Sequence, residues 1–154
     1  YGRIIQNSSI LGFISFPFRG AYIASKHALE GLSDTLRMEL RGTNIYVSII
    51  EPGPIETKFR QNAYAKYKEN IDTKSSHFHE RYKSMEERLK KETAPLPFTL
   101  PATAVLEKVL QALENSKPKA RYYVTLPTYL FAGLKRLLPR VLLEKILISA
   151  RTRV

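Results

Sequence analysis

Two apolar runs on either side of one long helical pattern constrain the fold of this chain more than any other feature. Residues 3–7 hold two adjacent isoleucines, and residues 45–50 are almost continuously apolar or β-branched. Runs of this kind are typical of parallel strands that are buried on both faces of a sheet. Residues 18–41 between them are predicted to be a helix, with apolar side chains every four positions: Ala24, Ala28, Leu32, Leu36 and Leu40. Two strands joined by a helix form a right-handed crossover, so the carboxyl ends of both strands lie at one edge of the sheet.

The rest of the chain extends the same alternation of helix and strand. Residues 101–115 carry the periodic apolar face of a second helix, and residues 120–125 form a third strand-like run. The alternation predicts an α/β fold with about three parallel strands and flanking helices. The sequence supplies no strand for the outer side of residues 3–7, so we expect that edge to be covered by another chain or by further sequence.

Tyr22 and Lys26 are the first candidates for chemistry. They are four residues apart near the start of the predicted helix, so both side chains emerge from one face and approach the same small volume. A free phenol has a pKa of about 10, and a nearby ammonium favours the phenolate. Bringing a tyrosine close to neutrality needs roughly 4 kcal/mol, much of which one close cation in a dry site can supply. The pair therefore predicts a tyrosine that exchanges a proton with a substrate oxygen.

Further candidates follow the two strands, where ligands bind in open parallel sheets. The hydroxyl of Ser9 can hold a substrate oxygen there, and the alternative is a serine that turns or caps the chain. Pro52-Gly53-Pro54 ends the second strand abruptly and is predicted to lie beside Ser9 and Tyr22. Taken alone, this segment is equally typical of a plain turn.

Three motifs in order carry a resemblance to a known family. They are Ser-Ser-x-x-Gly at 8–12, Tyr-x-x-x-Lys at 22–26, and Glu-Pro-Gly-Pro-Ile-Glu-Thr at 51–57. Residues 3–57 closely resemble the second half of a short-chain dehydrogenase/reductase, and the rest of the chain resembles it in element order. Phe-Pro-Phe at 16–18 and Ala-Leu-Glu-Gly-Leu at 28–32 are similar to the hydroxysteroid and retinol dehydrogenase branch.

The resemblance implies the C-terminal portion of a Rossmann-type doubly wound parallel sheet. It also implies an oxidoreductase that uses NAD or NADP to interconvert an alcohol and a carbonyl. Tyr22 would be the acid/base, Lys26 would lower the pKa of Tyr22 and hold the nicotinamide ribose, and Ser9 would orient the substrate oxygen. The loop after the second strand would hold the nicotinamide carboxamide, through these residues: Pro52, Gly53, Ile55 and Thr57.

Aromatic residues indicate a small apolar substrate, such as a steroid, a retinoid or a long-chain alcohol. Phe16 and Phe18 lie between Ser9 and Tyr22, where they are candidates to line its pocket. Residues 58–95 are charged and helical with narrow apolar stripes, and the resemblance implies that they form the substrate lid. A mobile cover also excludes water from hydride transfer, whereas the alternative is a pair of surface helices packed on the core.

The motif of a nucleotide-binding loop is missing from these 154 residues, because the seven glycines never cluster. The family's Asn-Asn-Ala-Gly stretch and the asparagine that completes its catalytic set are also missing. We interpret residues 1–154 as a single partial domain, the catalytic half, without the N-terminal nucleotide-binding half. We expect the chain alone to bind a dinucleotide poorly and not to catalyse. The choice between NAD and NADP depends on residues of the other half.

A formal charge of +11 raises the question of an anionic partner. Nucleic acid is not expected, because basic residues at 58–92 are mixed with acids and do not alternate with aromatic residues on a strand. The C-terminal tail, residues 128–154, is basic and amphipathic, and charges interrupt its apolar runs before the roughly 20 residues that a bilayer span needs. From residue 129 onward it can make peripheral contact with an anionic membrane, or pack on the third strand or a partner subunit.

The chain has no cysteine, which is consistent with a reducing compartment and excludes disulfides and thiolate metal sites. We expect a cytoplasmic or membrane-associated homo-oligomer. His77 and His79 diverge on a helix, so no metal site is expected. The alternative function is a non-catalytic module of the same fold that binds a membrane surface or a protein. The presence of Ser9, Tyr22 and Lys26 together argues against it.

Overall fold

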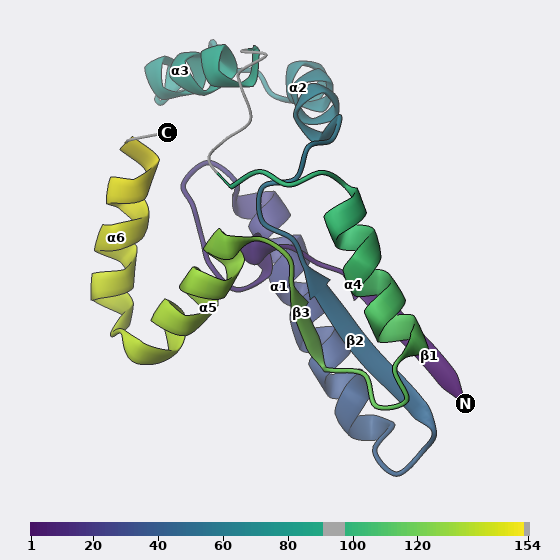
Figure 1. The fold of residues 1–154 in the computed structure, drawn as a ribbon. Helices are drawn as coiled ribbons and strands as arrows, with labels where there is room; N and C mark the ends of the chain where they lie inside the picture. The colour runs from purple at the N-terminus through teal and green to yellow at the C-terminus, as the bar shows by residue number, and fades with distance from the viewer. Residues whose placement is uncertain (91–97, 153–154) are drawn as a thin grey trace. The chain divides into compact units, whose positions relative to one another are not determined.

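The computed structural model describes residues 1–90 and 98–152 (Figure 1). The chain divides into two compact units, Tyr1–Ile55 with Pro97–Val154 and Glu56–Leu96. The second unit nearly coincides with residues 58–95, the predicted lid, of which residues 91–95 lie outside the described part of the chain. The lid role itself stays a prediction.

The first unit is built on a parallel sheet of three strands in the order β1-β2-β3. The strands are β1 (Gly2–Asn7), β2 (Ile45–Glu51) and β3 (Arg121–Tyr123). The register pairs Gly2 with Ile45 at one end of β1 and Asn7 with Ile50 at the other. The prediction of an α/β fold with parallel strands is confirmed. Among the described residues β1 pairs with β2 alone, and what covers its outer edge stays a prediction.

Helices connect the strands of the sheet and follow the last one. A short 3-10 turn, η1 (Ile10–Gly12), leaves β1, and α1 (Gly20–Glu39) leads into β2. The crossover to β3 contains α4 (Thr103–Glu114), and β3 is followed by α5 (Leu126–Leu137) and α6 (Arg140–Thr152). The predicted helices at 18–41 and 101–115 are therefore present with ends one or two residues inside the predicted bounds.

The two faces of the sheet are covered by different helices, with α1 on one face and α4 on the other (Figure 1). Ile50 and Tyr122 pack with Ala112 of α4 in one buried cluster. Because side chains alternate along a strand, Glu51 and Arg121 point to the opposite face, toward α1. The space between α1 and the sheet is therefore partly polar, and the candidate site described below includes these polar residues.

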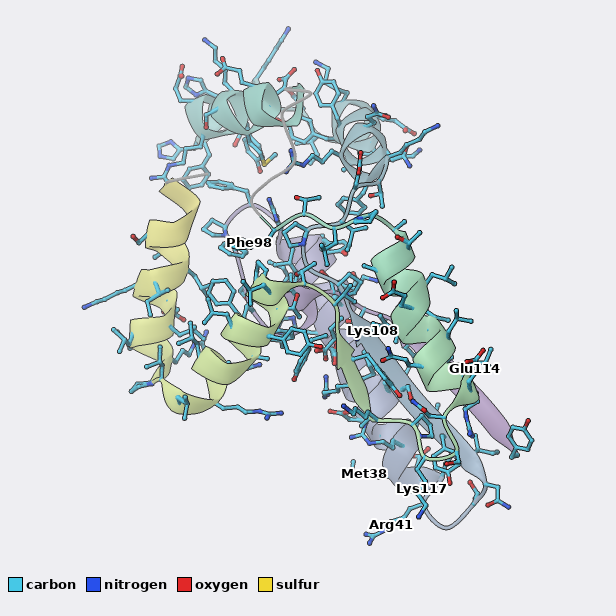
Figure 2. All side chains as sticks on the ribbon, in the orientation of Figure 1. Met38, Arg41, Phe98, Lys108, Glu114 and Lys117 are labelled. Carbon is cyan, nitrogen blue, oxygen red and sulfur yellow. The ribbon has the colours of Figure 1, made fainter. Side chains whose placement is uncertain are left out.

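The apolar stripe that predicted α1 is exposed in its first three residues, and only Leu36 and Leu40 are half-buried. Leu32 is 64% exposed, and Ala24 and Ala28 are also exposed. The buried side chains of the helix are those of Ile23, Glu30 and Ser33. Met38, near the end of α1, projects from the helix, as Figure 2 shows, and is 66% exposed. The outward face of α1 is therefore unusually apolar for a surface.

The C-terminal tail forms a helical hairpin of α5 and α6. Leu143 and Leu147 of α6 are buried in a cluster with Leu11, Ile14 and Ile23. Part of the tail thus packs on the turn after β1 and on the start of α1. The ring of Tyr129 in α5 also lies 5.3 Å from that of Tyr123, centroid to centroid, so the tail contacts β3 as one of the alternatives predicted. No helix in the described part of the chain is long and apolar enough to cross a membrane.

The second unit is a pair of helices, α2 (Phe59–Asn70) and α3 (His79–Lys90). Tyr67 is buried, and its ring lies 6.2 Å from that of Tyr82, centroid to centroid. The phenol of Tyr64 donates a hydrogen bond to Glu86 Oε1 at 3.1 Å. The two helices therefore form a small aromatic core of their own.

Candidate active site

Lys26 and Tyr22 lie at the carboxyl end of β1. The ammonium of Lys26 donates a hydrogen bond to the carbonyl oxygen of Asn7 at 2.9 Å. The same nitrogen lies 5.7 Å from the centroid of the Tyr22 ring. Tyr22 is half-buried against the cluster that contains Ile23 and Leu147. The helical spacing of four residues thus brings the phenol and the ammonium together at the predicted edge of the sheet.

Ser9 begins the turn that follows β1. Its hydroxyl accepts a hydrogen bond from Leu11 N at 3.1 Å and caps η1. The capping alternative is therefore present in the structure. A hydroxyl has one donor and two acceptor lone pairs, so this cap leaves the O–H able to donate to another oxygen.

The loop Pro52–Ile55 is tied to the Ser9 turn by backbone hydrogen bonds. Ile10 N donates to Pro52 O at 2.8 Å, and Ser8 N donates to Ile50 O at 2.8 Å. On its other side Leu100 N donates to Pro54 O at 3.2 Å. The loop therefore lies beside Ser9, as the topology predicted.

Gly53 is required where this loop meets the β3–α5 junction. A Cβ on Gly53 would lie 2.1 Å from Thr125 Oγ1 and 2.7 Å from Thr128 Oγ1. Both threonines are fully buried, and their hydroxyl oxygens are 3.0 Å apart in a mutual hydrogen bond. No side chain fits in that space, so the close approach of the loop to this pair depends on glycine.

Three predicted site residues remain: Thr57, Phe16 and Phe18. Thr57 belongs to the second unit, where its hydroxyl accepts a hydrogen bond from Phe59 N at 3.2 Å near the start of α2. Phe16 packs against the cluster of Leu11 and Ile14, and the guanidinium of Arg19 lies 6.0 Å from the centroid of its ring. Phe18 has a φ of 62°, which is uncommon for a bulky residue. The substrate roles of Phe16 and Phe18 stay predictions.

A buried ion cluster next to these residues was not predicted. Arg121 of β3 donates hydrogen bonds to Glu30 Oε2 and Glu51 Oε1, and to both oxygens of Asp34 at 2.9 and 2.7 Å. Glu30 and Glu51 are buried, and Glu51 is wholly inaccessible. Glu30 Oε1 and Glu51 Oε2 have no hydrogen-bond partner among the described residues.

Three carboxylates surround the guanidinium of Arg121, and Asp34 also pairs with Arg37 at 2.7 Å, so the negative charges of the cluster exceed the positive charges by one. Burial, followed by the charge of Glu30, raises the pKa of Glu51 to about 7, against the opposing effect of Arg121. Burial acts to lower the pKa of Arg121, but the hydrogen bonds that Arg121 donates to Glu30 and Glu51, with the charges of both carboxylates, outweigh it and raise that pKa. Burial, with the charge of Glu51, also raises the pKa of Tyr123. The cluster therefore favours the uptake of one proton near neutral pH.

One sequence signal pointed to the cluster. Glu30 and Asp34 continue the spacing of four residues that starts with Tyr22 and Lys26, so all four lie on one stripe of α1. Glu51 is a single charge at the end of a strand that is otherwise apolar. The partner of these carboxylates, Arg121, is 70 to 91 residues away in the chain and no spacing identifies it.

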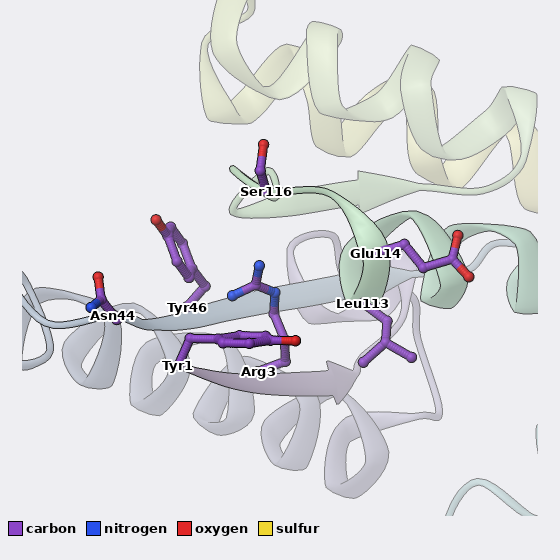
Figure 3. A pocket seen from close by; sticks show the side chains of 7 residues that line it. All are labelled: Tyr1, Arg3, Asn44, Tyr46, Leu113, Glu114 and Ser116. Carbon is purple, nitrogen blue, oxygen red and sulfur yellow. The ribbon is translucent and has the colours of Figure 1, made fainter.

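A separate pocket lies at the opposite end of the sheet (Figure 3). The guanidinium of Arg3 lies 5.4 Å from the centroid of the Tyr1 ring and 4.5 Å from that of the Tyr46 ring. Asn44 and Glu114 also line it. It borders the amino ends of β1 and β2, so it is remote from the Ser9 turn.

Comparison with known proteins agrees with the motifs. The family model described as short chain dehydrogenase matches residues 1–68. The chain is 45% identical over 146 residues to the uncharacterized oxidoreductase YbbO of Escherichia coli K12, over 95% of this chain and 48% of that protein. It is 34% identical over 127 residues to 17-beta-hydroxysteroid dehydrogenase type 1 of Homo sapiens, over 80% of this chain and 37% of that protein.

Solved structures share the fold. A short chain dehydrogenase from Burkholderia cenocepacia J2315 in complex with NADP aligns with a TM-score of 0.63 at 23% identity, over 94% of this chain and 46% of that one. The chain belongs to the short-chain dehydrogenase/reductase family, as its three motifs predicted. The chain spans about half the length of the curated relatives it matches.

Proposed function

We propose that this chain carries the catalytic residues of an NAD- or NADP-dependent oxidoreductase that interconverts an alcohol and a carbonyl. One observation carries the proposal. The Lys26 ammonium lies at the carboxyl end of β1, bonded to Asn7 O at 2.9 Å, on the same helix face as Tyr22. The Ser9 turn starts two residues after Asn7, and its backbone is bonded to Pro52. This arrangement supports one common site.

In the proposed reaction Tyr22 exchanges a proton with the substrate oxygen. The ammonium of Lys26 lies 5.7 Å from the centroid of the Tyr22 ring, so a positive charge is close to the group that gives up the proton. Ser9 orients the substrate oxygen with the O–H that its capping bond leaves able to donate. The cofactor, when bound, supplies or accepts the hydride.

The residues present fit the nicotinamide end of such a cofactor. We propose that Lys26 holds the ribose and that the loop residues Pro52, Gly53 and Ile55, with Thr57, hold the carboxamide. Backbone hydrogen bonds at Pro52 and Pro54 fix this loop from both sides, which supports a role as a rigid binding surface. The glycine pattern that would hold the pyrophosphate is not present in residues 1–154.

The proposed substrate is apolar, of the steroid, retinoid or long-chain alcohol class. Phe16 and Phe18 precede Tyr22 and support this choice, as does the name of the human relative, a hydroxysteroid dehydrogenase. The proposed lid is residues 58–95, whose described helices α2 and α3 share an aromatic core that includes Tyr67 and Tyr82.

The test is a turnover assay of the full-length protein with each cofactor against ketosteroids, retinal and long-chain aldehydes. We expect turnover with at least one pairing and a loss of several orders of magnitude in Tyr22→Phe. Tyr46→Phe makes the same chemical change at the other end of the sheet and is the matched control. A protein that turns over none of these compounds, or a Tyr22→Phe variant with normal turnover, contradicts the proposal.

We also propose peripheral membrane contact through the tail hairpin. Leu130, Leu137, Val141 and Ile148 are exposed on α5 and α6. The same two helices also carry four basic side chains: Lys135, Arg136, Arg140 and Lys145. Apolar and basic groups together favour an anionic lipid surface. Cosedimentation with phosphatidylserine vesicles but not with phosphatidylcholine vesicles, lost at high salt, is the expected result.

Finally, we propose a cytoplasmic homo-oligomer in which the outward face of α1 meets its copy. Leu32 and Met38 are exposed on this helix, and, apart from its chain neighbours and the backbone of its own helix, no described atom lies within 4 Å of the Cβ position of Gly31. A surface of this kind is suited to close helix contact. Light scattering should give a larger mass for the wild type than for Leu32→Glu.

A further inference from the structure

Arg121 joins α1 to the paired strands β2 and β3 of the sheet. Its guanidinium contacts Glu30 and Asp34 on α1 and Glu51 at the end of β2, while its backbone belongs to β3. Both oxygens of Asp34 are bonded to one nitrogen of Arg121, and the other two carboxylates share a second nitrogen. A planar guanidinium holds such partners in a fixed direction, which an ammonium does not.

On α1 the cluster lies one turn below the proposed catalytic pair. Glu30 follows Lys26 by four residues, which is about 6 Å along the helix axis and nearly the same angle around it. A roll of α1 by about 10° would displace a side-chain tip 6 Å from the axis by about 1 Å. The bonds from Arg121 to Glu30 and Asp34 oppose this roll, so they fix where Tyr22 and Lys26 point.

On β2 the same guanidinium holds the residue that directly precedes the loop. Glu51 is followed by Pro52, whose carbonyl oxygen accepts from Ile10 N beside Ser9. Proline has a fixed φ, so a displaced Glu51 backbone passes its movement on to the loop. Glu30 Oε1 and Glu51 Oε2 are buried without a hydrogen-bond partner among the described residues, so Arg121 is the cation that holds both carboxyl groups in place.

We propose that Arg121 is a positioning residue that sets α1 and the Pro52–Ile55 loop in one arrangement around the active site. The inference rests on the proposed function, because the arrangement matters only if Tyr22, Lys26 and the loop act on a cofactor and substrate. Arg121 touches neither of these. It acts through the three carboxylates, two on the helix that carries Tyr22 and Lys26 and one beside the loop.

The first test is Arg121→Lys in the full-length protein, with Arg41→Lys at an exposed position after α1 as the matched control. Lysine keeps the charge and loses the planar fork. We expect a folded variant whose kcat falls about 10- to 100-fold, as a 1 Å misplacement predicts, with a raised KM for the cofactor. Arg41→Lys should match the wild type. A folded Arg121→Lys variant with unchanged kcat and cofactor KM overturns the proposal.

The second test uses Glu51→Gln, which keeps an acceptor for Arg121 and removes the titrating group. Besides Arg121, the charged or titratable groups around Glu51 are Glu30, Tyr123 and Asp34. Asp34 is paired with Arg37, and the charge of Arg136 acts to lower the pKa of Tyr123. The wild-type kcat/KM should change across pH 7 as Glu51 ionises, and the Glu51→Gln profile should be flat there. If the pH profiles of the wild type and of Glu51→Gln are identical, the proposal is overturned. This test remains available if the Arg121→Lys variant does not fold.

A third readout needs no turnover, so it separates this proposal from the proposed function. Hydrogen exchange of the full-length protein should show faster exchange in Arg121→Lys at Ile10 N and Leu100 N, which donate to the loop carbonyls of Pro52 and Pro54. Gly2 N, bonded to Asn44 O at the other end of the sheet, is the internal control. Faster exchange confined to β3, or an equal rise at Gly2 N, overturns the proposal.

Discussion

Glu51 should make the stability of the protein fall as pH rises through the acid-to-neutral range. In the unfolded chain its carboxyl has the ordinary pKa of 4.5, whereas burial, with the charge of Glu30 second, raises its pKa to about 7 in the folded protein. Between these values the folded state holds a proton that the unfolded state has released. Stability therefore decreases with increasing pH in this window, and the loss is complete once pH exceeds the folded pKa. The two values correspond to about 3 kcal/mol.

Glu51→Gln isolates this contribution. The amide oxygen can still accept a hydrogen bond from Arg121, but it cannot titrate, so the variant should lack this part of the pH dependence. Urea unfolding of wild type and variant at pH 4.5 and pH 8 gives the two free energies of unfolding for each protein. We expect the wild type to lose about 3 kcal/mol more than the variant between these pH values. Titrating groups that do not interact with Glu51 are common to both proteins and cancel.

Glu39→Gln is the matched control, because Glu39 is an exposed carboxylate at the end of α1. It should follow the wild type at both pH values. If the Glu51→Gln curve stayed parallel to the wild type, Glu51 would titrate alike in both states and the raised pKa would be refuted. If the wild type gained stability with rising pH relative to the variant, the pKa of Glu51 would be lowered on folding and not raised.

Three other predictions concern the proposed site. Tyr22→Phe should lower kcat by orders of magnitude and leave cofactor affinity nearly intact, whereas Lys26→Ala should damage both, as steady-state kinetics with cofactor titrations would measure. Normal turnover of Tyr22→Phe at neutral pH would exclude Tyr22 as the acid/base. This 154-residue chain alone should bind NADH and NADPH weakly in calorimetric titrations, since the pyrophosphate site is missing, and micromolar binding would contradict this. Gly53→Ala should cost about 1–3 kcal/mol in thermal unfolding, because its Cβ would overlap Thr125 Oγ1, while Gly133→Ala in α5, with no atom within 4 Å, should be neutral or stabilising by up to about 1 kcal/mol.

The fold could be predicted because its signals are local. The apolar run at 45–50 and the helical period at 18–41 each decide one element without reference to the rest. Parallel pairing then follows from the chain order. The third strand was predicted as 120–125 but spans Arg121–Tyr123, because Thr125 is already the N-cap residue of α5. Element ends depend on tertiary contacts, and these are the part that local patterns do not fix.

The orientation of α1 could not be predicted from its apolar stripe. Hydrophobic periodicity places the apolar face of a helix against the core of its own chain. Here the inward stripe is occupied by Tyr22, Lys26, Glu30 and Asp34, and Leu32 lies on the outward face. Local rules are expected to fail where function dictates the residue, and the misplaced stripe is in keeping with the site proposed on this side of α1.

Stability does not explain why such a cluster lies between α1 and the sheet. Burying two carboxylates and a guanidinium costs desolvation, and apolar side chains of similar volume are often neutral or more stable in the same space. An apolar contact between α1 and β3 has no preferred direction, so it would let the helix roll by small angles at little cost. A guanidinium bonded to Glu30, Asp34 and Glu51 allows one roll angle and one loop position together. The test is a variant in which apolar residues replace Arg121, Glu30 and Glu51 together. If it is as stable as the wild type but has lost turnover, the cluster serves to orient α1 and the loop. If it is equally stable and still active, the cluster has no role in the site.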